Sequence, residues 1–134
     1  MAKVTMRHIE GMRFVGETDE HSIILESAYL GEQKGPAPME ALLMSLGGCT
    51  GMDVVAILRK MRDEPKKFEI EIEGETAQEH PKVYTKVHLK YIFWGVEYEK
   101  AKKAVELSQN RYCPVSATLK RGGTEVTYEI IIKD

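Results

Sequence analysis

Apolar and polar residues alternate over the first 28 positions of the chain. Turn-forming residues around Gly11 and Asp19 interrupt this alternation and leave residues 12–18 and 21–28 as further extended segments. Alternation with period two between turn residues is typical of β-strands. We therefore expect a three-stranded meander at the start of the chain.

A helical period replaces this alternation after the loop at 31–38, which contains two of the chain's prolines. The spacing predicts a helix from Met39 to Met61, with Pro38 suited to its first turn. So many apolar residues per turn indicate a helix that is buried on most sides. The apolar positions recur at steps close to three and four: Leu42, Leu43, Leu46, Cys49, Val54, Ile57, Leu58 and Met61.

Three glycines, Gly47, Gly48 and Gly51, interrupt this predicted helix. Each costs about 1 kcal/mol relative to alanine in a helix interior. We expect them to serve either a close backbone approach or a break in the helix beside Cys49. A break would place Cys49 near a new helix N-terminus, where the helix dipole favours the thiolate.

The remainder of the chain predicts two strands, a helix and a final strand. The element order is then βββ, long helix, ββ, helix, β, which indicates an α+β fold with antiparallel strands. One small sheet cannot cover so apolar a helix, so we expect a dimer that encloses the helices. The predicted elements are strands at 68–73 and 83–93, a polar loop at 74–82, an amphipathic helix at 97–111 and a strand at 124–133.

Composition places the chain among ordinary soluble domains. It has 134 residues, 43% apolar and 30% charged, and we expect one domain over 1–134. A net charge of −2, from 19 basic and 21 acidic residues, gives no support for a nucleic-acid partner. Neither a signal-peptide pattern at residues 1–10 nor a run of about 20 uncharged residues is found. We expect a cytoplasmic protein that does not span a membrane.

The two cysteines, Cys49 and Cys113, are the candidate chemical groups. Because the cytoplasm keeps thiols reduced, they are core residues, a redox pair or ligands rather than a permanent disulfide. Pro114 biases Cys113 away from helical dihedral angles. Asp53, four residues after Cys49, could raise the thiol pKa by like-charge repulsion or cap a helix, and both interpretations stay open.

Other kinds of site find no support in the sequence. None of the four histidines is spaced to join a cysteine at zinc, and no phosphate-binding loop or hydrolase motif occurs. We therefore expect no metal and no organic cofactor. The histidines are His8, His21, His80 and His88.

Two motifs together point to a known family. Residues 36–43 (PAPMEALL) lead into 47–55 (GGCTGMDVV), and 112–115 read YCPV. This pattern resembles the OsmC/Ohr family, and within it the YhfA-like branch. The resemblance implies an intertwined homodimer in which antiparallel sheets wrap two long central helices, with active sites at the subunit interface.

The resemblance also implies an activity. In the peroxidase branches the cysteine of the central helix attacks an organic hydroperoxide and the second cysteine resolves the product as a disulfide, which a dithiol reduces. By motif, Cys49 would attack and Cys113 would resolve, without a metal or cofactor. Those branches carry a glutamate directly after the proline that precedes the helix; here Met39 has that place and Glu40 follows, about 100° further round the helix.

The second helper of the peroxidase branches is an arginine from the N-terminal sheet, and Arg13 is its counterpart here. The alternative interpretation of Arg13 is a surface salt bridge, and that of Glu40 is a favourable negative charge in the first helical turn. Three functions remain open: a thiol-dependent peroxidase, a non-enzymatic module that binds a small lipophilic ligand, and a cysteine-based redox sensor.

Overall fold

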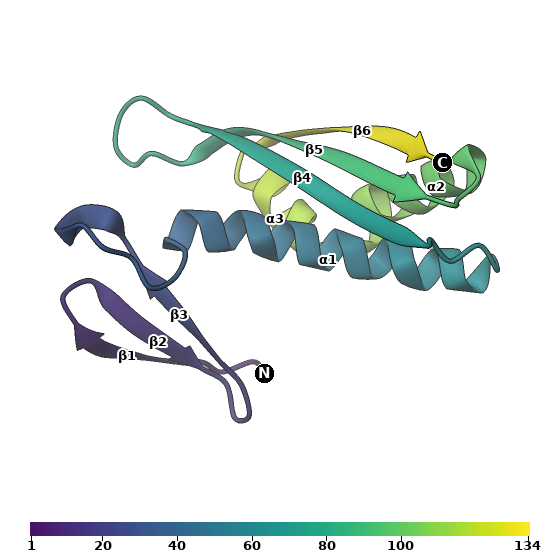
Figure 1. The fold of residues 1–134 in the computed structure, drawn as a ribbon. Helices are drawn as coiled ribbons and strands as arrows, with labels where there is room; N and C mark the ends of the chain where they lie inside the picture. Colours follow the sequence, from purple (N-terminus) through teal and green to yellow (C-terminus); the bar gives the residue numbers. More distant parts are fainter. The chain divides into compact units, whose positions relative to one another are not determined.

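The computed structural model describes residues 1–134, and the chain divides into two compact units (Figure 1). The first unit comprises Met1–Met44 and the second Ser45–Asp134. The long helix α1 (Pro38–Lys60) begins in the first unit and continues in the second. The expectation of one domain over the whole chain stays a prediction.

The N-terminal unit contains the predicted meander. Its three strands are antiparallel in the order β1-β2-β3, which confirms the interpretation of the alternating pattern. Gly11 makes the first turn with a φ of +53°, a backbone conformation that glycine adopts without steric cost. A short 3₁₀ turn follows the third strand. The bounds are β1 (Thr5–Glu10), β2 (Arg13–Glu17), β3 (Ser22–Glu26) and η1 (Ala28–Leu30).

A second three-stranded sheet lies in the C-terminal unit, in the order β4-β5-β6. Strands β4 (Lys67–Thr76) and β5 (Tyr84–Trp94) are antiparallel, as predicted. Strand β6 (Glu125–Lys133) runs parallel to β5, so the prediction of antiparallel strands throughout was wrong here. The physical reason is the connection: the chain crosses from β5 to β6 through helices rather than through a hairpin, and such crossovers join parallel strands.

The crossover contains three helical segments: the first two cover the helix predicted at 97–111, and the third was not predicted. Helix α2 (Tyr98–Leu107) continues into a π-helical turn, η2 (Ser108–Tyr112), and helix α3 (Pro114–Arg121) follows. Pro114 ends the first helical run because its ring disfavours helical geometry at Cys113. The same proline starts α3 at the first helical position, where its missing N–H has no consequence.

Helix α1 is continuous, so the expected break beside Cys49 was wrong. The other expectation for the glycines, close backbone approach, is confirmed where α1 packs on β4. A Cβ atom at Gly47 would lie 2.5 Å from Cδ1 of Ile72, and one at Gly51 would lie 3.3 Å from Cδ1 of Ile70. Gly47 and Gly51 therefore let the helix lie close to the sheet, whereas a Cβ atom at Gly48 would meet nothing within 4 Å.

The core of the C-terminal unit lies between its sheet and the helices, which cover one face of the sheet in Figure 1. Helix α1 contributes a stripe with a spacing of four residues, Leu46, Thr50, Val54 and Leu58, each fully buried. One member of that stripe, Thr50, carries a hydroxyl. The rest of the core is made by alternate residues of β5 and by residues of α2: Val87, Leu89, Tyr91, Phe93, Ala101, Ala104 and Val105.

Helix α1 is long and apolar enough to cross a membrane by length and composition alone, with a mean hydropathy of 1.8 over its most apolar window. The core helix of a soluble protein meets the same criterion. In this chain only one stripe of α1 is buried: 28% of that window is buried, and Met44 and Met52 are exposed. The prediction of a helix buried on most sides was therefore wrong for the single chain.

Candidate redox site

The two predicted cysteines meet in the C-terminal unit. Cys49 projects from α1 and is partly exposed, whereas Cys113 lies between η2 and α3 with 3% of its surface exposed. Both are free thiols, and a hydrogen bond joins their side chains. The pair therefore has the proximity that disulfide formation requires.

Backbone hydrogen bonds hold Cys113 on both sides. Its own N–H donates to the carbonyl of Ser108 at 2.8 Å, and the N–H of Ser116 donates to its Sγ at 3.4 Å. With φ −77° and ψ 104°, Cys113 is the extended residue that caps the N-terminus of α3. Its thiol is thus anchored at the junction of two helical segments.

The environment of Cys113 keeps its thiol protonated. The pKa of Cys113 is raised from its usual value of about 9 to about 11, chiefly by burial and to a smaller extent by the hydrogen bond and charge of Cys49. The N–H groups of Ser116 and Val115 act in the opposite direction. At neutral pH Cys113 is therefore a hydrogen-bond donor and not a thiolate.

A connected group of polar side chains lies beside the cysteines, buried except for the partly exposed Asp53. Sequence reasoning singled out Asp53 alone and missed the rest. One signal was available: Thr50 interrupts the apolar stripe of α1, and a hydroxyl on a buried face requires a partner. The group draws on α1, β5, η2 and α3 and comprises Thr50, Asp53, Tyr91, Ser108, Gln109 and Ser116.

Tyr91 stands at the centre of this group. Its ring packs edge-on against Tyr128, with centroids 6.1 Å apart, and its hydroxyl reaches Thr50 Oγ1 at 2.7 Å. Burial raises the pKa of Tyr91 to about 12, so the phenol keeps its proton at neutral pH.

Arg13 lies in the N-terminal unit, where it makes a partly buried ion pair. Its Nε donates to Glu26 Oε1 at 2.9 Å and its Nη1 to Glu10 at 3.0 Å. The N–H of Lys34 also donates to Glu26, at 2.8 Å. The Arg13 hydrogen bond, followed by that of Lys34, lowers the pKa of Glu26, and Glu26 in turn raises the pKa of Arg13. These contacts give Arg13 a structural role in its own unit.

Glu40 also belongs to the N-terminal unit and is exposed. Its Oε1 accepts a hydrogen bond from the N–H of Ala37 at 2.9 Å, and so satisfies a backbone donor just before α1. The roles of Glu40 and Arg13 as helpers in the reaction stay predictions.

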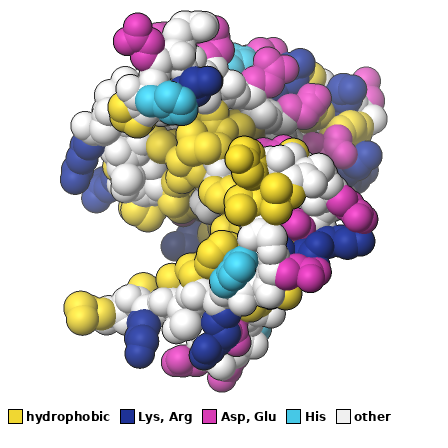
Figure 2. Space-filling view, turned by 90° about the vertical axis from the view of Figure 1, so that its left-hand side faces the viewer, with side chains coloured by type: hydrophobic (Ala, Val, Ile, Leu, Met, Phe, Trp, Pro, Cys, Tyr) yellow, Lys and Arg dark blue, Asp and Glu magenta, His cyan; other side chains and the backbone are white.

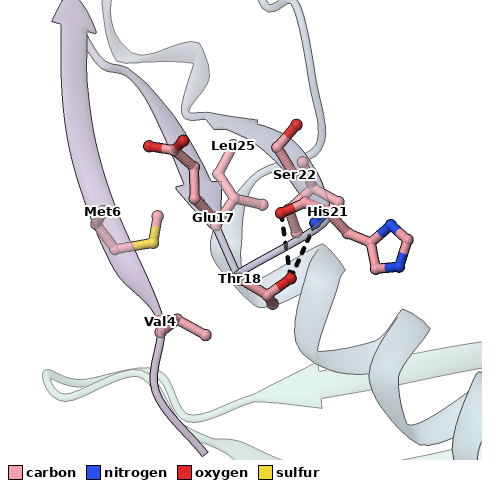
Figure 3. A pocket seen from close by; sticks show the side chains of 9 residues that line it. Val4, Met6, Glu17, Thr18, His21, Ser22 and Leu25 are labelled. Atoms are coloured by element: carbon pink, nitrogen blue, oxygen red, sulfur yellow. Dashed lines mark hydrogen bonds between the residues drawn. The ribbon is translucent and has the colours of Figure 1, made fainter.

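An apolar pocket opens within the N-terminal unit, with a volume of about 290 Å³. In Figure 3 Met6, Val4 and Leu25 surround it, while Thr18 is hydrogen-bonded to the backbone of His21 at its rim. Many apolar side chains of this unit are also exposed, and hydrophobic side chains spread over the face seen in Figure 2. The lining residues are Val4, Met6, Gly16, Glu17, Thr18, His21, Ser22, Ile23 and Leu25.

Metal-binding geometry is not found: no group of three or more His, Cys, Asp or Glu side chains could hold an ion.

Comparison with known proteins identifies the family. The model of the OsmC-like protein family matches residues 31–129. The chain belongs to the OsmC-like family. It is 34% identical to Protein YhfA of Escherichia coli (strain K12) over 129 residues, which is 94% of this chain and 96% of that protein. The resemblance seen in the two cysteine motifs is thereby confirmed.

Solved structures agree with this assignment. A hypothetical protein from Aquifex aeolicus VF5 superposes with a TM-score of 0.85 at 32% identity, covering 100% of this chain and 98% of that one. The organic hydroperoxide resistance protein OhrB of Bacillus subtilis has the same fold, with a TM-score of 0.70 at 23% identity and 97% of each chain covered. The α+β OsmC-like fold is confirmed, with β6 parallel to β5.

Proposed function

We propose that this OsmC-like protein reduces organic hydroperoxides with Cys49 as the attacking thiol and Cys113 as the resolving thiol. The observation that carries the proposal is the hydrogen-bonded pair itself, in which one thiol is partly exposed and the other buried. A member of the same fold, OhrB of Bacillus subtilis, is named for organic hydroperoxide resistance.

The first step oxidises Cys49. Its thiolate attacks the distal oxygen of the hydroperoxide, an S–O bond forms and the O–O bond breaks. The sulfur becomes a sulfenic acid, and the leaving alkoxide takes a proton and departs as the alcohol. Of the two thiols, the more exposed Cys49 suits this step, because burial keeps Cys113 protonated.

The second step closes the disulfide. The sulfur of Cys113 attacks the sulfenic sulfur of Cys49, the S–S bond forms, and the hydroxide that leaves combines with the Cys113 proton as water. A dithiol reductant then restores both thiols and is itself oxidised to a disulfide. A second thiol in contact with the first protects the sulfenic acid from further oxidation.

A homodimer is part of this proposal. Large apolar side chains of the N-terminal unit, such as Ile23 and Leu30, remain 60% and 65% exposed, more than isolated surface residues account for. A second copy of this chain is the partner that we propose for them. A cytoplasmic location, where the thiols stay reduced between turnovers, is likewise proposed.

Stoichiometric oxidation tests the function. Reduced protein mixed with one equivalent of cumene hydroperoxide should lose two hydrogens in intact mass and both free thiols within seconds. Cys49→Ser should not react, and Cys113→Ser should stop at a sulfenic acid on Cys49 that a dimedone probe captures. Each single variant is the control for the other. Wild-type thiols that persist for minutes would refute the proposal.

The apolar pocket of the N-terminal unit supports a second candidate, the binding of a small lipophilic molecule without chemistry. Its volume of about 290 Å³ and its apolar lining suit a short acyl chain. Native mass spectrometry with added decanoic acid tests this candidate, with Met6→Lys as the blocking variant and Cys49→Ser as the control. Equal binding by Met6→Lys and wild type, or no binding by either, would remove it.

A further inference from the structure

We infer that a chain of side-chain hydrogen bonds running in one direction, from Ser116 to Asp53, positions Cys113 for disulfide formation with Cys49. The inference rests on the proposed function, since it concerns the resolving step of that reaction. It assigns a positioning role to residues that do not touch the hydroperoxide.

The direction of the hydrogen bonds can be worked out starting from Asp53. Ser108 Oγ donates to Asp53 Oδ2 at 2.9 Å, and a carboxylate can only accept. A hydroxyl has one proton to donate, so at the contact of 2.7 Å between Ser108 and Thr50 it is Thr50 Oγ1 that donates. The proton of Thr50 is thereby used.

The remaining contacts follow in turn. At the contact of 2.7 Å between Tyr91 Oη and Thr50 Oγ1, Tyr91 must donate. Gln109 Nε2 donates to Tyr91 Oη at 2.7 Å, and Gln109 Oε1 accepts from Ser116 Oγ at 2.7 Å. Five consecutive hydrogen bonds therefore point from Ser116 towards the carboxylate of Asp53, and each hydroxyl spends its single proton in that direction.

Two members of the chain hold Cys113 directly. The carbonyl of Ser108 accepts from the N–H of Cys113, and the N–H of Ser116 donates to Cys113 Sγ. Asp53 lies one helical turn after Cys49 on α1. The hydrogen-bonded chain thus connects Ser108 and Ser116, which both bond to Cys113, to the helix that carries Cys49.

The location of the hydrogen-bonded chain indicates that it positions Cys113 rather than simply stabilising the fold. Thr50 occupies a fully buried place in an apolar stripe, where valine would fill a similar volume without requiring partners. Ser108 and Gln109 lie in a π-helical turn, an irregularity that is frequent at functional sites. A connected polar chain in such a place fixes one geometry, because every member needs its neighbour.

Hydrogen exchange of the reduced protein tests the positioning directly. Thr50→Val removes the central hydroxyl and keeps the volume, whereas Thr50→Ser keeps the hydroxyl and is the matched control. The amides of Cys113 and Ser116 should exchange about tenfold faster in Thr50→Val and within about twofold of wild type in Thr50→Ser. Amides of β5 report global opening and set the baseline. Unchanged protection at Cys113 and Ser116 in Thr50→Val would overturn the inference, whatever the activity of the protein.

The consequence for disulfide formation is measured in glutathione redox buffers, which need no peroxide. The effective concentration of the thiol pair should fall about tenfold in Thr50→Val and recover in Thr50→Ser. Equal values for the two variants would overturn the inference while leaving the proposed function intact. A wild-type protein that forms the disulfide in these buffers but does not react with cumene hydroperoxide would refute the proposed function alone.

Discussion

Replacement of Cys113 by serine should flatten the alkaline limb of the stability curve. In the folded protein the pKa of Cys113 lies at about 11, against its usual value of about 9. Because the folded state holds the proton more tightly, the stabilisation is complete below about pH 9 and is lost as pH rises through about 11. Serine at this position can still accept the N–H of Ser116, so the variant keeps the cap of α3.

The two pKa values fix the magnitude. The full difference is worth about 2.7 kcal/mol, and about 1.4 kcal/mol of it should be lost by about pH 10. Tyr91, whose pKa is raised to about 12, loses its proton later and adds little in this range. The measurement should therefore stop at about pH 10.

Urea denaturation of wild type and Cys113→Ser at about pH 7.5 and about pH 10 provides the assay, with a phosphine reductant and one fixed protein concentration. The wild type should lose about 1.4 kcal/mol more than the variant over this interval. In Cys49→Ser, thiolate absorbance near 240 nm should still develop only well above pH 9, because burial is the first cause of the shift. Equal losses in wild type and Cys113→Ser would show that the Cys113 thiol is not held protonated, and would refute this reasoning.

Two further predictions concern packing and acid stability. Gly48→Ala should stabilise the protein by up to about 1 kcal/mol, because a Cβ atom there meets open space. Gly47→Ala should stabilise it less, because its Cβ atom would meet Ile72. Urea midpoints of the two variants test this, and a larger gain in stability for Gly47→Ala would contradict the packing of α1 on β4. Glu26→Gln should flatten the acid limb of the stability curve. A carboxyl group whose pKa is lowered in the folded protein stabilises it at pH values above the ordinary carboxyl pKa, and this stabilisation is lost as the pH falls. Thermal unfolding between about pH 6 and about pH 3 checks this prediction, and an unchanged acid limb would argue against the ion pair of Glu26 with Arg13.

Periodicity along the chain was enough to predict the elements whose burial is one-sided. The meander of the N-terminal unit and the β4–β5 hairpin followed from alternation, and α1 followed from helical spacing. The glycines of α1 were recognised as costly, yet the sequence left a break and a close approach equally open. Only the contact with the sheet decides between them, and that contact depends on residues distant in the sequence.

The crossover was harder because one residue has two local effects. Pro114 disfavours helix before it and favours helix after it, and the prediction used only the first effect. Helix α3 was therefore not predicted, and antiparallel strands were expected throughout. The direction of β6 depends on that helical connection, which the pattern of the strand itself does not encode.

The candidate site, too, was predicted only in part from the sequence. Cys49 and Cys113 were chosen from sequence and lie together in the structure. The hydrogen-bonded chain beside them was missed because its members are common polar residues, scattered between Thr50 and Ser116. Their importance comes from burial and mutual contact, which local sequence does not report.

The parallel pairing of β6 with β5 has a consequence for the order of folding during synthesis. β4 and β5 are made one after the other and can pair as a hairpin at once, but the far side of β5 has no strand beside it until the crossover and β6 have left the ribosome. An unpaired strand edge in a nascent chain is a template for association with other chains. The interval ends only after α2, η2 and α3 have been made, and the speed of translation through the crossover therefore sets how long the nascent sheet is open to aggregation.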